Sequence, residues 1–275
     1  MSLTLVHLSD IHFGAHVALD QVRDLEEFVP SLNPSAVVVS GDLTQRARHG
    51  EFQRALRFVE GLRETSPVLV IPGNHDTEWW KSPFGLLGKQ PRHRKYLKYF
   101  GSELGPVVEI PGAILVGTLS SHGLDLGSVT WNPRDLTVKG HLPASETARA
   151  ESHFRAGPEC LRVLALHHNV LRGEISHRMG LAHWRDAHKR LVSCGADLVL
   201  CGHDHQESVG QLDGGVVVAA SGTHTGMSRG GRPSAFNVIT ADANVIAVRQ
   251  HRWDGETGRF IPGTEARYAR PLRRT

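Results

Sequence analysis

The chain has few cysteines, no long apolar run and little net charge. Its three cysteines, Cys160, Cys194 and Cys201, are an odd number whose spacings match neither a zinc site nor a disulfide framework. We therefore expect buried, reduced thiols. No apolar run approaches the roughly 20 residues needed to cross a bilayer, so no membrane span is predicted. A net charge of +3 over 275 residues is too small to indicate a nucleic-acid partner by itself.

The opening of the chain predicts no targeting segment, and the composition shows no break. The opening residues, MSLTLVHLSD, enter a strand-like pattern without a basic stretch or an apolar signal core, so we expect a cytoplasmic protein. Nothing divides the chain, which predicts a single domain over 1–275 with a possible basic C-terminal tail at 265–275. No pattern in the sequence indicates an oligomeric state.

Strand-like apolar runs alternate with amphipathic stretches, which is typical of an α/β fold. The later strand-like runs are joined by short links and predict an antiparallel part of the sheet. Four stretches have helical patterns: 20–31, 49–64, 144–157 and 183–194.

Histidine is abundant, with 18 copies, and it is the commonest metal ligand among the side chains. Five apolar runs each end on Asp, Asn or His, often after a glycine. In α/β folds the carboxyl ends of the strands border the ligand crevice. The five ends are HLSDIH (7–12), VVSGDL (38–43), IPGNHD (71–76), LALHHN (164–169) and LCGHDH (200–205).

The spacing within these ends predicts which side chains point together. Side chains alternate faces along an extended chain, so Asp10 and His12 should share one face, as should His203 and His205. Each pair can therefore bind one ion or two adjacent ions. His7 is out of phase with Asp10 and His12, and we expect it to be a structural histidine.

The order of these motifs resembles the calcineurin-like metallophosphoesterase superfamily. The matching motifs are Asp10-Ile11-His12, Gly41-Asp42, Gly73-Asn74-His75-Asp76, His167, and Gly202-His203-Asp204-His205. They extend from residue 10 to residue 205, about three quarters of the chain. The resemblance implies a sandwich of two mixed β-sheets flanked by helices.

The resemblance also implies two metal ions held by seven side chains. The first ion would be held by Asp10, His12, Asp42 and His205. The second would be held by Asp42, Asn74, His167 and His203, so that Asp42 bridges the two. Many relatives have proline where this chain has Asn169, and His168 would then be a neighbour that lines the pocket.

Two metal ions suit the cleavage of a phosphate ester, whose negative charge resists attack. Mixed nitrogen and oxygen ligands fit Mn, Fe, Co, Ni or Zn, and the absence of thiolate argues against a closed structural zinc site. Asp10 and Asp42 contribute about −2 against about +4 from two divalent ions. The net charge of the site is then about +2, and hydroxide and a phosphodiester, each about −1, would neutralise it. This charge balance weakly favours diesters over monoesters.

His75 and Asp42 are the predicted catalytic residues. Neighbours on an extended chain face apart, so His75 is free of the ion if Asn74 binds it. We interpret His75 as a hydrogen-bond donor to the phosphate and as a general acid, as the resemblance also implies. Asp76 is expected to support or cap the turn rather than bind metal.

The motifs LSDIHFG, GDLTQ, PGNHD and CGHDHQE are most similar to class III cyclic nucleotide and glycerophosphodiester phosphodiesterases. We therefore expect hydrolysis of a small diester such as cyclic AMP. Two alternatives stay open. One is a DNA nuclease of the same superfamily, suggested by the basic and aromatic stretch 89–100, which alternatively forms a helix with Tyr96, Leu97 and Phe100 packed inward. The other is a non-catalytic metal-binding scaffold.

Five further residues follow or adjoin the motifs and are weaker candidates for contacting the substrate. They are His16, Arg46, His122, His168 and His224.

Overall fold

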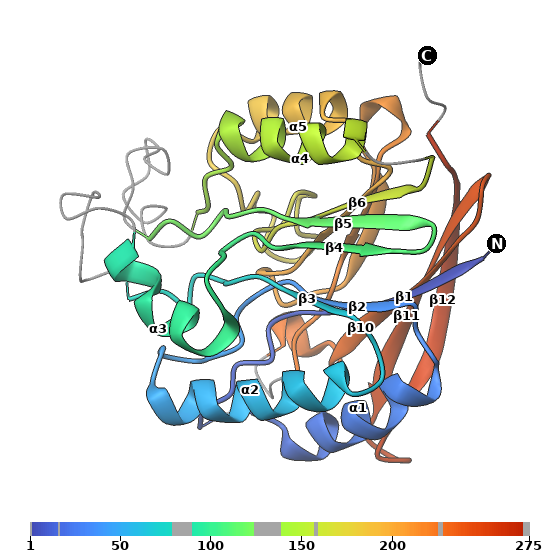
Figure 1. Ribbon diagram of the computed structural model, residues 1–275. Coiled ribbons are helices and arrows are strands. Elements are labelled where there is room, and N and C mark those ends of the chain that lie inside the picture. The colour runs from blue at the N-terminus through green and yellow to red at the C-terminus, as the bar shows by residue number, and fades with distance from the viewer. Residues whose placement is uncertain are drawn as a thin grey trace.

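The computed structural model describes residues 2–15, 17–78, 90–123, 139–156, 159–224 and 228–271. Within these ranges the chain forms two six-stranded sheets that pack face to face, with helices on both outer sides (Figure 1). Each sheet contains parallel and antiparallel pairs. The expected sandwich of two mixed sheets flanked by helices is therefore confirmed.

The first sheet joins the beginning of the chain to its end. Its order is β12-β11-β10-β1-β2-β3. Strands β1, β2 and β3 run parallel, whereas β10, β11 and β12 add to β1 as an antiparallel meander, as the short links between the late strands predict. The strands are β1 (Leu3–Leu8), β2 (Ala36–Val39), β3 (Val68–Val70), β10 (Ala235–Ala241), β11 (Val245–Asp254) and β12 (Arg259–Ala269).

The second sheet is built from the middle of the chain, in the order β4-β5-β6-β7-β9-β8. Its four central strands run parallel, and an antiparallel strand lies at each edge. The strands are β4 (Val107–Ile110), β5 (Ala113–Gly117), β6 (Leu161–Ala165), β7 (Leu198–Cys201), β8 (Ser208–Gln211) and β9 (Val217–Ala220).

Strands β2, β3, β5, β7 and β9 are buried on both faces, which explains why they are apolar throughout rather than alternating. In β1, Leu5 enters the cluster between the two sheets, while Val6 and Leu8 enter the cluster under the helices. A third cluster lies on the outer side of the second sheet and includes Leu164 and Val199. These three apolar layers hold the sheets and helices together.

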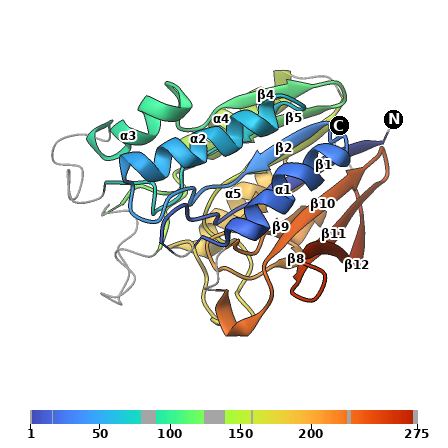
Figure 2. The same cartoon turned by 90° about the horizontal axis from the view of Figure 1, so that it is seen from below.

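Helices α1 (Leu19–Ser31) and α2 (His49–Arg63) cover the first sheet, and α4 (Ala144–Ala156) and α5 (Trp184–Ser193) cover the second. Figure 2, seen from below, shows α1 and α2 in front of the strands of the first sheet. Each of the four helices begins and ends within one residue of the expected range. None of the helices in the described part of the chain combines the length and apolar character that crossing a bilayer requires.

The basic stretch 89–100 forms helix α3 (Gln90–Phe100), which packs its aromatic side inward. Tyr96 is buried and donates its hydroxyl to the carbonyl of Val70 at 3.0 Å. Arg92 is buried, and Lys95 pairs with Glu78 at 3.0 Å. The interpretation as an inward-packed helix is confirmed, because two of the basic side chains serve the fold instead of forming a free basic face.

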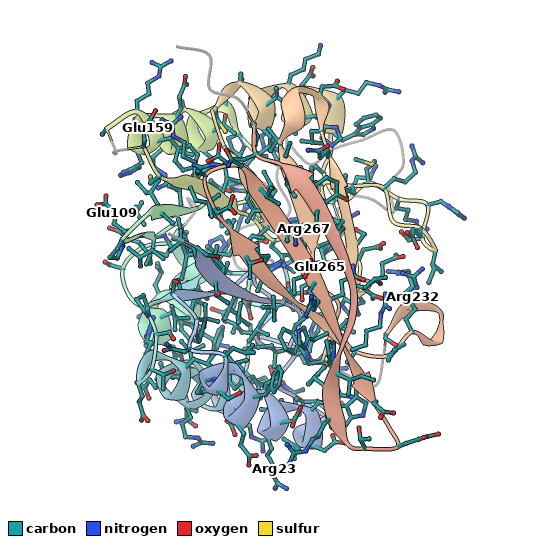
Figure 3. All side chains as sticks on the ribbon, turned by 90° about the vertical axis from the view of Figure 1, so that its right-hand side faces the viewer. Arg23, Glu109, Glu159, Arg232, Glu265 and Arg267 are labelled. Atoms are coloured by element: carbon teal, nitrogen blue, oxygen red, sulfur yellow. The ribbon has the colours of Figure 1, made fainter. Side chains whose placement is uncertain are left out.

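The first part of the possible basic tail, 265–269, belongs to a strand. Glu265 to Ala269 belong to β12 and pair with β11. Figure 3 shows Glu265 and Arg267 together on this strand, and they form an ion pair of 3.1 Å. Pro262 obscured the strand in the sequence, but the fold tolerates proline there because β12 is an edge strand with a register shift opposite.

Arg270, directly after β12, binds residues at the start of two strands of the second sheet. Its guanidinium donates to Asp197 Oδ2 at 3.0 and 2.7 Å and also to the carbonyl of Cys160, while its backbone N–H donates to Asn244. The side chains of Arg270 and Asp197 are 14% and 4% exposed. The contact therefore joins the two sheets through a largely buried charge pair.

We predict that Arg270→Ala lowers the free energy of unfolding by about 2–4 kcal/mol, because Asp197 stays buried without its cation. Urea unfolding at pH 7.5 measures the effect. Arg267→Ala, which removes a side chain 66% exposed from the same strand, is the matched control, with an expected change within about 0.5 kcal/mol. Equal losses in the two variants would contradict the anchoring role.

Candidate metal centre

The five polar motifs lie at the carboxyl ends of five parallel strands. Strands β1, β2 and β3 of the first sheet and β6 and β7 of the second all end at the same side of the sandwich. The structure brings together there all seven side chains to which the resemblance assigns metal binding: Asp10, His12, Asp42, Asn74, His167, His203 and His205.

Four of these side chains form one group of facing donor atoms. One donor atom from each of Asp10, His12, Asp42 and His205 lies within 4.8 Å of every other. Asp10 Oδ1 is 3.4 Å from His205 Nε2, and Asp42 Oδ2 is 3.5 Å from His12 Nε2. The two ring nitrogens, His12 Nε2 and His205 Nε2, face each other at 3.0 Å.

A second group shares the Asp42 carboxylate with the first. Donor atoms of Asp42, His167 and His203 lie within 4.8 Å of one another. Asn74 Oδ1 is 3.0 Å from His167 Nε2 and 2.9 Å from His203 Nδ1. His203 and His205, two residues apart, thus enter different groups, and Asp42 belongs to both.

Hydrogen bonds from behind fix how these side chains face. His167 donates Nδ1–H to the carbonyl of Ser40 at 2.9 Å, which leaves Nε2 toward Asp42. Asp10 Oδ2 accepts the backbone N–H of His203, and Asp42 Oδ1 accepts that of His75. Each aspartate therefore uses one oxygen to hold the backbone and keeps the other for the shared space.

Burial and mutual charge shift the titration of these groups. Burial alone would raise the pKa of Asp42, but the charges of His167, His75 and His12 outweigh it and hold the pKa below its usual value. The pKa of Asp10 is likewise held well below its usual value by His12 and His205 against the effect of burial. Burial would lower the pKa of His167, but Asp42 raises it to about 9. The carboxylates are thus kept ionised.

The donor set fits a pair of metal ions. Among the described residues, the buried Asp10 Oδ1 has no hydrogen-bond partner, although it faces the ring of His205. Buried polar atoms usually have a hydrogen-bond partner, and a carboxylate oxygen without one among imidazole nitrogens is suited to binding a cation. Imidazole nitrogens combined with carboxylate and amide oxygens, without thiolate, suit Mn, Fe, Co, Ni or Zn.

The backbone of the site is left-handed at five of the seven positions. The φ angles are 54° at Asp10, 51° at His12, 51° at Asp42, 76° at His203 and 56° at His205. Each such conformation costs of order 1–3 kcal/mol for a residue other than glycine. The simple alternation of an extended chain, used above to pair Asp10 with His12 and His203 with His205, therefore does not describe the site.

Contacts between neighbouring strand ends hold this backbone in place. Asp10 donates its N–H to the carbonyl of Gly41 at 3.0 Å, and His12 donates to that of Asp42 at 2.9 Å. Gly202 permits the close approach of β7, because a Cβ atom there would collide with Ser9 Oγ and Asp10 Oδ2.

His75 and Asp76 have distinct positions beside the two groups. His75 is half-buried, donates Nδ1–H to the carbonyl of Gln45 at 2.8 Å, and has its ring centroid 4.8 Å from that of His12. Asp76 is fully buried and accepts the backbone N–H groups of Leu43, Thr44 and Gly73. Asp76 therefore joins the ends of β2 and β3, in keeping with the expected supporting role.

The weaker substrate candidates are in different surroundings. Arg46 is exposed directly after Gln45. His168 is buried with its ring 4.4 Å from that of His203, and its Nδ1 meets Ser120 Oγ at 2.9 Å. His122 is also buried, with Nε2 3.1 Å from the carbonyl of Leu119. His16 lies outside the described residues.

The ring of His224, which was expected to contact the substrate, packs against aromatic side chains. Its ring is fully buried and lies 5.6 Å from that of Phe260 and 6.4 Å from that of Phe236. Its backbone, rather than its ring, serves the site, since its N–H donates to the carbonyl of Asp10 at 3.2 Å. This position gives no support to the expected substrate contact.

Sequence reasoning missed the groups that orient the site. The carbonyls of Ser40 and Gln45 fix the His167 and His75 rings, but a backbone carbonyl leaves no signal in a sequence. Ser120, the partner of His168, lies 48 residues away from it in a stretch without a motif. Only the fold brings these groups to the histidines.

The family is decided by the match of residues 3–207 to the family described as Calcineurin-like phosphoesterase. The chain belongs to the calcineurin-like phosphoesterase family. The resemblance in the motifs is therefore confirmed. Members of the family use a dinuclear metal centre, and the Asp/His groups described above are the place in this chain that could hold one.

Two curated relatives match part of this chain. A stretch of 109 residues is 34% identical to a glycerophosphodiester phosphodiesterase, GpdQ, of Enterobacter lignolyticus, covering 34% of this chain and 38% of that protein. The second relative is a transmembrane protein with a metallophosphoesterase domain from Danio rerio. It is 33% identical over 109 residues, covering 37% of this chain and 24% of that protein. The matches thus span well under half the length of either relative.

Solved structures share the fold of this chain at low sequence identity. A dimetal phosphatase from Danio rerio superposes with a TM-score of 0.66 at 14% identity, covering 98% of this chain and 99% of that one. The purple acid phosphatase PPD1 from yellow lupin gives 0.69 at 11% identity, covering 98% and 54%. These similarities establish the architecture alone.

We predict that Asp42→Asn removes most bound metal from this protein, because the shared carboxylate faces both groups of donors. The metal content, measured after loading with Mn²⁺ and gel filtration, should fall from about two ions per chain, the number that a two-metal site holds, to less than one. Asp254→Asn, which changes a carboxylate at the end of β11 that accepts hydrogen bonds from the following turn, is the control and should retain both ions. Full metal content in Asp42→Asn would exclude the shared role.

A second prediction concerns His7, which points away from the metal groups as expected. It is fully buried, and its Nε2 lies 2.9 Å from Ser40 Oγ. Burial lowers the pKa of His7 to about 3 from 6.5. Below pH 6.5 the unfolded chain binds a proton at His7, whereas the folded chain binds it only near pH 3. The stability that comes from burying the neutral His7 ring is therefore complete above pH 6.5 and is lost as the pH falls toward 3.

Between pH 7.5 and 5.5, the unfolding free energy of the EDTA-treated protein should therefore fall by about 1.4 kcal/mol more than that of His7→Gln. Urea unfolding at the two pH values measures the difference. An identical pH dependence in the two proteins would show that His7 is not the group responsible.

Proposed function

We propose that this chain hydrolyses phosphodiester bonds of a small substrate, such as a 3′,5′-cyclic nucleotide, at a dinuclear metal centre. The observation that carries the proposal is the sharing of Asp42 between two groups of donors, with His75 beside them. The partial match to a glycerophosphodiester phosphodiesterase supports the choice of diesters.

The seven side chains named above would hold two metal ions, one in each group. When bound, such ions polarise the phosphate, make a hydroxide nucleophile available near neutral pH and stabilise the leaving oxygen. The protein's own part is to keep Asp10 and Asp42 ionised and the histidine rings oriented, as their hydrogen bonds and pKa shifts do.

The substrate would approach from the side where the site is open. Asp10, His12, Asp42 and His167 are almost completely buried, whereas Asn74, His75, His203 and His205 are partly exposed. His75 thus stands at the entrance. Because its Nδ1–H is held by Gln45, its Nε2 is the atom that would hydrogen-bond the phosphate or deliver a proton to the leaving oxygen.

The charges also favour a diester. Two aspartates and two divalent ions give a site of about +2, which hydroxide and a singly charged diester would neutralise. A doubly charged monoester would leave about one negative charge in excess unless a cationic side chain compensated. A monoester would therefore bind less favourably at the centre itself.

We predict that His75→Ala retains its metal ions but hydrolyses bis(p-nitrophenyl) phosphate about 10²–10⁴-fold more slowly, as the loss of a general acid does. Metal content and kcat are measured on the same preparation. His153→Ala on α4 serves as the control, with kcat unchanged. An unaltered kcat in His75→Ala would reject the acid role.

A substrate panel distinguishes the alternatives. With Mn²⁺, Fe²⁺ or Zn²⁺, the proposal predicts turnover of cyclic nucleotides or glycerophosphodiesters ahead of phosphomonoesters and single-stranded DNA. Preferred cleavage of DNA would favour a nuclease. Metal binding without turnover of any ester would favour a non-catalytic scaffold.

A further inference from the structure

The segment that carries His203 and His205 has a second face, opposite the metal groups. Asp204 lies between the two histidines, is 6% exposed, and turns its carboxylate away from the site. Gln206, also buried, turns the same way and donates to Asp204. The contacts made by this second face involve parts of the chain that no family motif includes.

Arg229 binds Asp204 at two points. Its Nε donates to the backbone carbonyl of Asp204 at 3.1 Å and lies 3.3 Å from the carboxylate oxygen Oδ1. Arg229 belongs to the short 3-10 turn η6 (Arg229–Gly231), which precedes β10. A single guanidinium nitrogen therefore fixes both the backbone and the side chain of the residue between two candidate ligands.

The loop 171–178 holds the same segment from another direction. Ser176 donates its hydroxyl to Asp204 Oδ2 at 2.8 Å, and Ile175 donates its N–H to Gln206 Oε1 at 3.1 Å. Gly173 lies so close that a Cβ atom there would collide with Asp204 Oδ2. The loop and the segment thus fit closely against each other.

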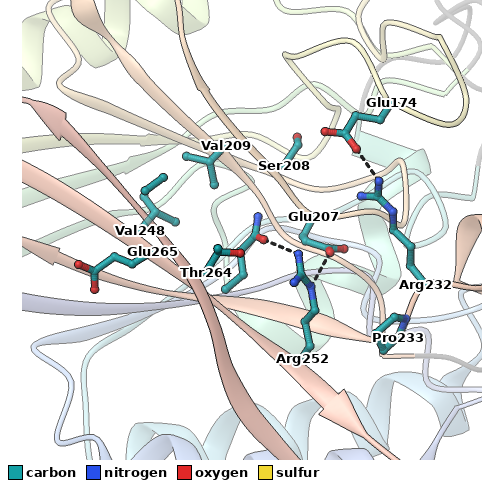
Figure 4. Close-up of a pocket in the computed structure, with 12 residues that line it drawn as sticks. Glu174, Glu207, Ser208, Val209, Arg232, Pro233, Val248, Arg252, Thr264 and Glu265 are labelled. Carbon is teal, nitrogen blue, oxygen red and sulfur yellow. Dashed lines mark hydrogen bonds and ion pairs between the residues drawn. The ribbon is translucent and has the colours of Figure 1, made fainter.

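Further ion pairs connect these elements. Figure 4 shows Arg232, next to η6, paired with Glu174 of the loop, and Arg252 of β11 paired with Glu207. Glu207 is 3% exposed and ends the segment at a cavity between β8 and strands β11 and β12. The segment 203–207 is therefore held from outside along its whole length.

We propose that Arg229 and Ser176 are positioning residues of the metal centre, which act through Asp204 to direct His203 and His205 into separate metal groups. The inference rests on the dinuclear centre of the proposed function.

The physical reason is the left-handed backbone of the two histidines. His203 and His205 have φ angles of 76° and 56°, which residues other than glycine keep only where several contacts enforce them. Asp10 Oδ2 holds the N–H of His203 from the metal side. Arg229 and Ser176 supply the opposing contacts, so that removing them frees the segment to relax away from the ligand geometry.

The test compares Mn²⁺ binding by the metal-free protein and its variants in isothermal titration calorimetry. Arg229→Gln should weaken Mn²⁺ binding about 10-fold or more, the scale seen when groups that orient metal ligands are removed. Ser176→Ala should weaken it in the same direction. Arg229→Lys should restore part of the affinity, because an ammonium can bond Asp204 but lacks the fixed planar geometry of the guanidinium.

Arg249→Gln is the matched control. It removes a similarly exposed arginine from an ion pair whose partner is Glu265 of β12 rather than a residue of the 203–207 segment. Its Mn²⁺ affinity, and its kcat and KM for bis(p-nitrophenyl) phosphate, should equal those of the unmodified protein. At saturating Mn²⁺, Arg229→Gln should lose kcat with little change in KM, because ligand geometry rather than substrate contact is altered.

Urea unfolding in EDTA separates positioning from a general structural role. The unfolding midpoint of metal-free Arg229→Gln should fall by much less than that of metal-free Arg270→Ala, because the Arg229 side chain is 44% exposed whereas that of Arg270 is 14% exposed. Unchanged Mn²⁺ affinity in both Arg229→Gln and Ser176→Ala, or a loss equal to that of Arg249→Gln, would overturn the inference. A fall in the metal-free unfolding midpoint of Arg229→Gln as large as the fall in Arg270→Ala would also overturn the inference. If the parent protein bound no Mn²⁺, the dinuclear centre itself would fail.

Discussion

The carboxylate of Asp42 is the interaction on which the site depends. It follows β2, a central strand of the first sheet, yet it faces His12 from its own sheet and His167 from the second sheet. Its pKa is held low although it is almost fully buried, because histidines surround it. An ionised group in that position draws two sets of nitrogen donors together, and the remaining ligands are arranged around it.

Placing so many ligands around one carboxylate requires a backbone that a regular strand does not provide. The strands end before the ligands, and the chain then turns through left-handed residues whose strain is offset by hydrogen bonds between neighbouring strand ends. The same demand explains the close packing at Gly202, where the end of β7 lies against Asp10. Catalytic geometry and local strain are therefore two aspects of one arrangement.

The sandwich makes this arrangement stable. Three apolar layers hold the two sheets and their helices in a fixed relation, and Arg270 adds a largely buried charge contact between the sheets. The site is consequently supported by rigid strands, while the contacts that set its finer geometry come from loops. Asp204 illustrates the division, since β7 brings it to the site but η6 and the loop 171–178 decide its orientation.

Local sequence determined the strands other than the edge strands β4, β8 and β12, four of the helices and the identity of the polar groups at the strand ends. Continuous apolar runs such as VVV in β2 have few alternatives to a buried strand, and the five motifs each place their side chains at such an end. Strand β12 escaped prediction because Pro262 and Gly263 are unfavourable in strands, and only its position at the sheet edge permits them.

Only the tertiary structure decided which side chains meet. The burial of His224 beside Phe260, the separation of His203 from His205, and the carbonyls of Ser40 and Gln45 that orient two histidine rings all depend on contacts between distant segments. The sequence specifies which groups are present and where each strand ends, because those follow from neighbouring residues. Their mutual geometry follows from how two sheets pack, and that is set by the whole chain at once.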